Sequence, residues 1–159
     1  MTRKSRFDYI AHLAGRPHKK YWKTLGRSWR SEVIVELDSE NFEREALNSI
    51  RPCIVKFHNN GCHLCAGLAP VFARLQKKYG QSMKFANIDT WKNFETAKPY
   101  LDGGVPTIQI FLRDNDPVLV EYPEEPSPYT GYPREYLDKW IYNYLLSYYV
   151  MEAKKEKNG

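Results

Sequence analysis

Two cysteines separated by two residues lie where a predicted strand gives way to a predicted helix. Residues 51–59, RPCIVKFHN, are compact and β-branched, which favours a strand. Residues 66–80, AGLAPVFARLQKKYG, repeat apolar side chains at helical spacing and end on a glycine. Cys62 therefore comes at the start of a helix, where unpaired backbone N–H groups and the helix dipole favour a thiolate.

The rest of the chain alternates the two kinds of element. Alternating or β-branched runs predict strands at 32–38, 83–89, 103–112 and 117–122, and helical patterns follow at 38–47, 92–101 and 133–153. Turn residues at 113–116 join the last two strands into a hairpin. This order predicts an α/β fold: a central mixed β-sheet flanked by helices, with a parallel part and a terminal hairpin.

The charge of the chain is unevenly distributed. The 159 residues carry a net charge of +5, yet residues 1–30 hold nine Lys and Arg against one acid. We therefore expect three parts, a basic N-terminal extension at 1–30, a domain at 31–153 and a solvated tail at 154–159. The basic residues are mixed with tyrosines and tryptophans, which suits an acidic protein or nucleic-acid partner.

Composition narrows the class of protein and its compartment. A chain with 42% hydrophobic and 14% aromatic residues is not of disordered composition. It has no apolar run of the ~20 residues that a membrane span needs, and no stretch typical of a signal peptide, so we expect a cytoplasmic protein without a membrane partner. In a reducing compartment a close cysteine pair is catalytic, redox-sensing or metal-binding.

Metal binding stays open as an alternative at this point. Zinc or an iron–sulfur cluster could use Cys62 and Cys65 with His58 or His63. However, structural zinc commonly takes two spaced pairs, and the third cysteine, Cys53, fits a buried core position better than a ligand. We therefore expect neither a metal nor a bound cofactor.

Four local signatures together resemble the thioredoxin superfamily, over roughly residues 32–150. They are PCIVKFHNNGCHLC with a proline five residues beyond the second cysteine, FANID, GGVPTIQIF, and YTGYPREYLDKWI. The resemblance implies a thioredoxin-like fold in which a cis-proline, Pro106, and the preceding Val105 present backbone to an extended substrate. Gly131 is then expected to line the same groove.

The redox pair departs from the family pattern. Residues 61–65 read Gly-Cys-His-Leu-Cys, so Gly61 and Leu64 would contact substrate, and a protonated His63 would favour the thiolate and a more oxidising pair. Lys56 stands where the family carries a buried acid. Two readings of Lys56 stay open: a neutral base whose pKa is lowered by burial, or a side chain that extends to the surface.

The predicted function is thiol–disulfide oxidoreductase, exchanging disulfides with protein substrates. Cys62, exposed at the helix start, is expected to be the nucleophile, and the shielded Cys65 the resolving cysteine. A thioredoxin reductase or glutathione would reset the pair. The alternative is a binding or scaffold module of the same fold, in which the basic extension docks a partner and the thiols are dispensable.

Overall fold

The computed structural model describes residues 33–158. They fall into two compact units, one ending at Tyr136 and one beginning at Leu137, which are described separately. The basic extension predicted at residues 1–30 lies outside the described residues. The first unit is built around one five-stranded sheet, and its strands are β1 (Val35–Leu37), β2 (Cys53–His58), β3 (Lys84–Asp89), β4 (Thr107–Phe111) and β5 (Val118–Leu119).

The sheet is mixed, as the sequence predicts. Its strand order is β1-β3-β2-β4-β5, with β1, β3 and β2 parallel and with β4 and β5 antiparallel to their neighbours. The register aligns Lys56 with Asn87 and His58 with Asp89, so β2 and β3 end at the same edge. The loops that follow these two strands are therefore neighbours, and one of them leads to Cys62.

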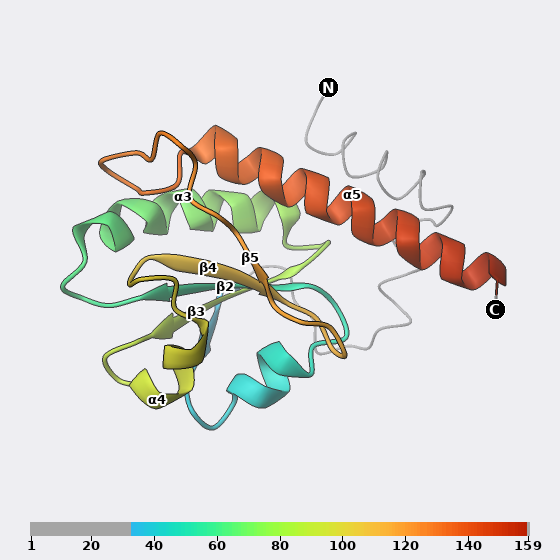
Figure 1. The fold of residues 1–159 in the computed structure, drawn as a ribbon, viewed down its shortest axis with the longest axis horizontal. Coiled ribbons are helices and arrows are strands. Elements are labelled where there is room, and N and C mark those ends of the chain that lie inside the picture. The colour runs from blue at the N-terminus through green and yellow to red at the C-terminus, as the bar shows by residue number, and fades with distance from the viewer. Residues whose placement is uncertain (1–32, 159) are drawn as a thin grey trace. The chain divides into compact units, whose positions relative to one another are not determined.

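Helices cover both faces of the sheet (Figure 1). Helix α3 (His63–Tyr79) lies on one face, and the short π-helical turn η1 (Glu43–Leu47) and α4 (Phe94–Ala97) lie on the other. A 3₁₀ turn, η2 (Lys98–Tyr100), continues α4 where Pro99 prevents an α-helical hydrogen bond. The core beneath η1 and α4 is a buried cluster of residues Leu37, Phe42, Ala46, Cys53, Val55, Phe57, Ala86, Ile88, Ala97 and Phe111.

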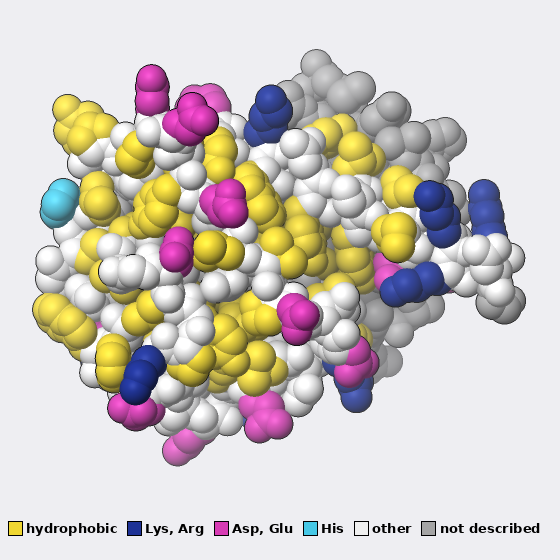
Figure 2. Space-filling view, viewed as in Figure 1, with side chains coloured by type: hydrophobic (Ala, Val, Ile, Leu, Met, Phe, Trp, Pro, Cys, Tyr) yellow, Lys and Arg dark blue, Asp and Glu magenta, His cyan; other side chains and the backbone are white. Residues whose placement is uncertain are grey.

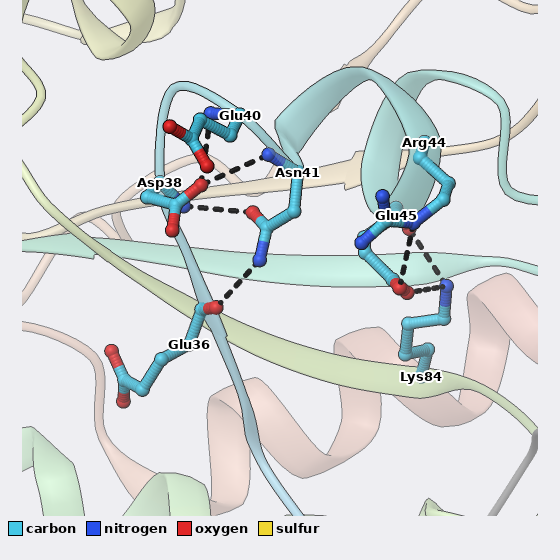
Figure 3. Close-up of polar contacts among 7 residues, drawn as sticks. All are labelled: Glu36, Asp38, Glu40, Asn41, Arg44, Glu45 and Lys84. Atoms are coloured by element: carbon cyan, nitrogen blue, oxygen red, sulfur yellow. Dashed lines mark hydrogen bonds and ion pairs between the residues drawn. The ribbon is translucent and has the colours of Figure 1, made fainter.

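The connection after β1 is held by its own polar side chains (Figure 3). The Asp38 carboxylate accepts hydrogen bonds from the backbone N–H groups of Glu40 and Asn41, at 2.8 and 2.9 Å. One turn later, Lys84 Nζ lies 3.0 Å from Glu45 Oε2 and also donates to the Glu45 carbonyl oxygen. Asp38 thus fixes the turn that leads into η1, and Lys84 ties η1 to β3.

The second unit consists of most of a long helix, α5 (Arg134–Asn158). Its buried residues Leu137, Ile141, Leu145 and Tyr149 recur every four positions, which defines one apolar stripe. The helix continues five residues beyond the predicted end at 153, because Lys and Glu are good helix formers. Within residues 33–158, no helix is long and apolar enough to cross a membrane.

Candidate functional site

The cysteine pair closes the turn between β2 and α3. The backbone N–H of Gly61 donates to the Asn59 side-chain oxygen at 3.0 Å, and Cys62 N–H points at the Asn59 carbonyl at 3.4 Å. Cys62 is the N-terminal cap of α3, and its sulfur accepts the backbone N–H of Cys65 at 3.1 Å. The two cysteines form a disulfide with their Cα atoms 5.2 Å apart.

The two sulfur-bearing residues differ in access to solvent. Cys62 is half-buried, whereas Cys65 is only 4% exposed. Between them, His63 is exposed and Leu64 half-buried. A substrate disulfide can therefore reach Cys62, whereas Cys65 is shielded from it. Cys65 is shielded as expected, Cys62 is less exposed than expected, and the roles given to the four residues stay predictions.

The loop before β4 forms the other side of the site. The Val105–Pro106 peptide bond is cis, and the Val105 carbonyl oxygen lies 3.7 Å from Cys62 Sγ. Gly131 has a φ of +72°, and a Cβ added to it would lie 3.5 Å from Pro106 Cγ. The Tyr122 hydroxyl donates a hydrogen bond to the Pro106 carbonyl oxygen. The structure thus brings Val105 next to the cysteine pair and Gly131 next to Pro106.

A proline-rich loop between β5 and α5 approaches α3. A Cβ on Gly67, in the second turn of α3, would overlap the carbonyl oxygen of Tyr129. Tyr122 and Tyr132, at the two ends of the loop, stack with ring centroids 4.4 Å apart. Gly67 therefore permits a close approach of two backbones, and this approach holds the loop near the start of α3.

Lys56 lies inside the protein, on the sheet face that α3 covers. The residue is 4% exposed, and its Nζ lies 5.1 Å from the centroid of the Phe72 ring of α3. Burial lowers the pKa of Lys56 from its ordinary value, and the charge of Glu36 opposes this shift only in part. The reading in which Lys56 extends to the surface is wrong, because the strand places it under α3. Whether it acts as a base stays a prediction.

His58 lies on the same face of β2 as Lys56. Burial lowers the pKa of His58, the charge of Lys56 lowers it further, and Glu36 and Asp89 oppose both effects. Its Nε2 atom is buried and has no hydrogen-bond partner within the described residues. Cys53, on the opposite face, is fully buried, and its burial raises the thiol pKa to about 12. Cys53 is therefore a core residue, as predicted.

One residue beside the site was missed from the sequence. Trp91, in the loop after β3, lies over Gly61: a Cβ on Gly61 would be 2.6 Å from Cη2 of the indole. A tryptophan two residues after a strand carries no signal by itself. It could have been found only by noting that the parallel strands β2 and β3 end at the same edge.

Side chains that could bind a metal ion do not cluster in the described part of the chain. Among residues 33–158, no three His, Cys, Asp or Glu side chains come close enough to hold a metal ion. The basic extension lies outside the described residues, so its predicted acidic-protein or nucleic-acid partner stays a prediction.

Comparison with known proteins agrees with the geometry. The Thioredoxin family model matches residues 33–127. A thioredoxin from Acetoanaerobium sticklandii is 36% identical over 78 residues, covering 49% of this chain and 74% of that protein. Protein disulfide isomerase-like 2-1 from Oryza sativa subsp. japonica is 31% identical over 84 residues, covering 52% of this chain but 23% of that protein.

A solved structure shows the same fold. The J-Trx1 fragment of ERdj5 superposes with a TM-score of 0.59 and 18% identity, covering 70% of this chain. The chain spans about half the length, 51%, of that solved structure. The family match, the mixed sheet and the disulfide at the start of α3 all agree. The chain belongs to the thioredoxin family, and both this membership and the Cys62–Cys65 pair support thiol–disulfide oxidoreductase activity.

Proposed function

We propose that the chain exchanges disulfides with protein substrates through the Cys62–Cys65 pair. The observation that carries the proposal is the position of Cys62 Sγ, which caps α3 and accepts the Cys65 N–H at 3.1 Å. A backbone N–H directed at sulfur stabilises a thiolate, and the positive end of the helix dipole adds to this effect. Cys62 is also the more exposed of the two cysteines.

The reaction proceeds in two exchanges once the pair is reduced. The Cys62 thiolate attacks one sulfur of the substrate disulfide, a new S–S bond forms, and the other substrate sulfur leaves as a thiolate. Cys65 then loses its proton and attacks Cys62 Sγ, which releases the second substrate sulfur. The substrate gains two electrons, and the chain is left as the Cys62–Cys65 disulfide seen here.

Substrate binding and resetting of the pair belong to the same proposal. The backbone around Val105 lies beside Cys62 and supports pairing with an extended substrate segment. Because thioredoxins are among its relatives, we assign the return of electrons to a thioredoxin reductase or to glutathione. A reducing compartment such as the cytosol suits this direction of transfer.

Single-cysteine variants test the order of attack. Cys65→Ser should trap a mixed disulfide with a peptide disulfide, seen as an added mass that dithiothreitol removes. Cys62→Ser is the matched control and should trap none, because Cys65 is shielded. An adduct on Cys62→Ser as abundant as on Cys65→Ser would contradict the assignment.

The direction of transfer is read from the reduction potential of the pair. A value near about −270 mV in a glutathione or dithiothreitol buffer is typical of a reductase, and one near about −120 mV of an oxidant. A protonated His63 beside Cys62 moves the potential toward the second value. His63→Pro should therefore lower the measured potential, and an unchanged or higher potential would contradict this role of His63.

A further inference from the structure

The exposed ring of Trp91 lies over Gly61, the residue that precedes Cys62. Trp91 is 66% exposed, and a Cβ built on Gly61 would meet its ring at 2.6 and 2.8 Å. Gly61 immediately precedes Cys62, so only a residue without a side chain leaves room for the indole here. Large exposed apolar groups mark interaction sites when they gather at one place.

The backbone that carries the indole is held by hydrogen bonds within its loop and to the end of β2. The Asp89 carboxylate accepts the backbone N–H groups of Trp91 at 2.9 Å and of Lys92 at 3.3 Å. The Thr90 N–H donates to the His58 carbonyl at 2.8 Å, which attaches the loop to the end of β2. The backbone of Trp91 is thus held in place before any partner arrives, which lowers the entropy cost of binding.

An aromatic side chain also reaches the surface at the loop that contacts the Cys62 sulfur. The Val105 carbonyl lies 3.7 Å from Cys62 Sγ, and Tyr122, 37% exposed, hydrogen-bonds to the next residue, Pro106. Figure 2 shows hydrophobic side chains reaching the surface at the end of the molecule where α3 begins, on the left. The Cys62 sulfur thus has the Val105 backbone beside it, and the indole of Trp91 covers the preceding residue, Gly61.

We propose that Trp91 is a specificity-determining residue that contacts the substrate residue next to the attacked cysteine. This inference rests on the proposed function and names the preferred substrate, a disulfide flanked by an apolar or aromatic residue. Tryptophan offers a large, rigid apolar surface, and aromatic contacts of this kind change affinity by about fivefold. A basic flanking residue offers the indole less apolar surface than an aromatic one does.

Three peptides test the preference. They share one disulfide and differ only in the residue beside the attacked cysteine, which is Phe, Ser or Lys, and kcat/KM is measured for each with one reductant. The wild-type chain should prefer Phe to Ser by about fivefold, and should also prefer Phe to Lys. Trp91→Ala should bring the Phe:Ser ratio near one, and Trp91→Phe should retain most of it.

Two further variants test the position of the indole and control for the loss of an exposed apolar side chain elsewhere. Gly61→Ala, whose methyl group would displace the indole, should lower the ratio as Trp91→Ala does. Ile50→Ala should leave the ratio unchanged, because Ile50 is 48% exposed but precedes β2, at the end opposite the site.

The outcomes separate this inference from the function on which it rests. Wild-type chain that exchanges none of the peptides overturns the proposed function and the inference together. Exchange with equal rates for Phe and Ser, a preference for Lys, or a ratio unchanged in Trp91→Ala overturns the role of Trp91 alone.

Discussion

The ammonium nitrogen of Lys56 lies 5.1 Å from the centroid of the Phe72 ring, beneath α3. Ring and cation attract one another, but such contacts are worth only about 0.5–2 kcal/mol. Removing an ammonium group from water costs more than that, and burial accordingly lowers the pKa of Lys56 from its ordinary value of 10.5. The lysine is therefore a net cost to folding at neutral pH.

Lys56→Met is expected to raise the free energy of unfolding at pH 7 by about 1–3 kcal/mol. With the folded pKa below 10.5, the unfolded chain binds more protons between these two values, so wild-type stability rises as the pH approaches 10.5. The variant should lack this rise. Urea unfolding at pH 7 and pH 10 measures both effects, with the exposed Lys98→Met as control. Destabilisation by Lys56→Met would show that the ammonium group is well solvated.

The same substitution should raise the pKa of His58. Burial lowers that pKa first and the charge of Lys56 second, so removing the charge leaves a pKa above that of the wild type. A histidine with a lowered folded pKa costs stability as the pH falls from 6.5 through that pKa. NMR titration of the imidazole resonances of wild type and Lys56→Met is the measurement. An unchanged titration curve would mean that the two side chains do not interact.

Gly67→Ala should destabilise the chain by about 1–3 kcal/mol. Alanine favours a helix over glycine by about 1 kcal/mol, but the new methyl group would overlap the Tyr129 carbonyl oxygen, and a backbone atom cannot move aside cheaply. The clash therefore outweighs the helix propensity. Denaturant unfolding of this variant is compared with that of Ala66→Ser, at an exposed position of the same turn. A stabilised Gly67→Ala would show that the loop gives way freely.

Glu45→Gln should lower stability by about 0.5–1 kcal/mol at pH 7 and by little at pH 3. Burial raises the pKa of Glu45, but the hydrogen bond and charge of Lys84, helped by Arg44, lower it more. A lowered carboxyl pKa contributes stability above 4.5 that is lost as the pH falls through the folded value. Thermal unfolding at both pH values is the test, with the exposed Glu43→Gln as reference. A loss of equal size at pH 3 would rule out the ion pair as its source.

The sequence predicts most of the fold because its local signals agree with each other. The run that became β2, the apolar spacing of α3 and the turn residues before β5 each specify their element through near neighbours. The boundaries of the elements are less well predicted. Strand β5 is only Val118–Leu119, where the sequence predicts 117–122, and α5 extends to Asn158 through a charged segment, where the sequence predicts an end at 153. Charged residues indicate exposure, and exposure does not exclude a helix.

The site is predicted less completely, because its parts meet only through the sheet. The cysteine pair and Val105–Pro106 carry signals of their own and lie together as expected. Trp91 lies beside Gly61 because β2 and β3 share a register, which no local pattern reveals. The sequence does not decide between the two readings of Lys56 for a related reason. Alternation places this residue on one face of β2, but only the position of α3 shows that this face is covered.

Both outer strands of the sheet are very short. Strand β1 has three residues and β5 has two, so each outer edge offers few unpaired backbone groups to another chain. Long, flat edges are the templates on which partly exposed sheets aggregate. If the chain binds extended substrate segments near Cys62 as proposed, edges as short as those of β1 and β5 offer such segments little to pair with elsewhere.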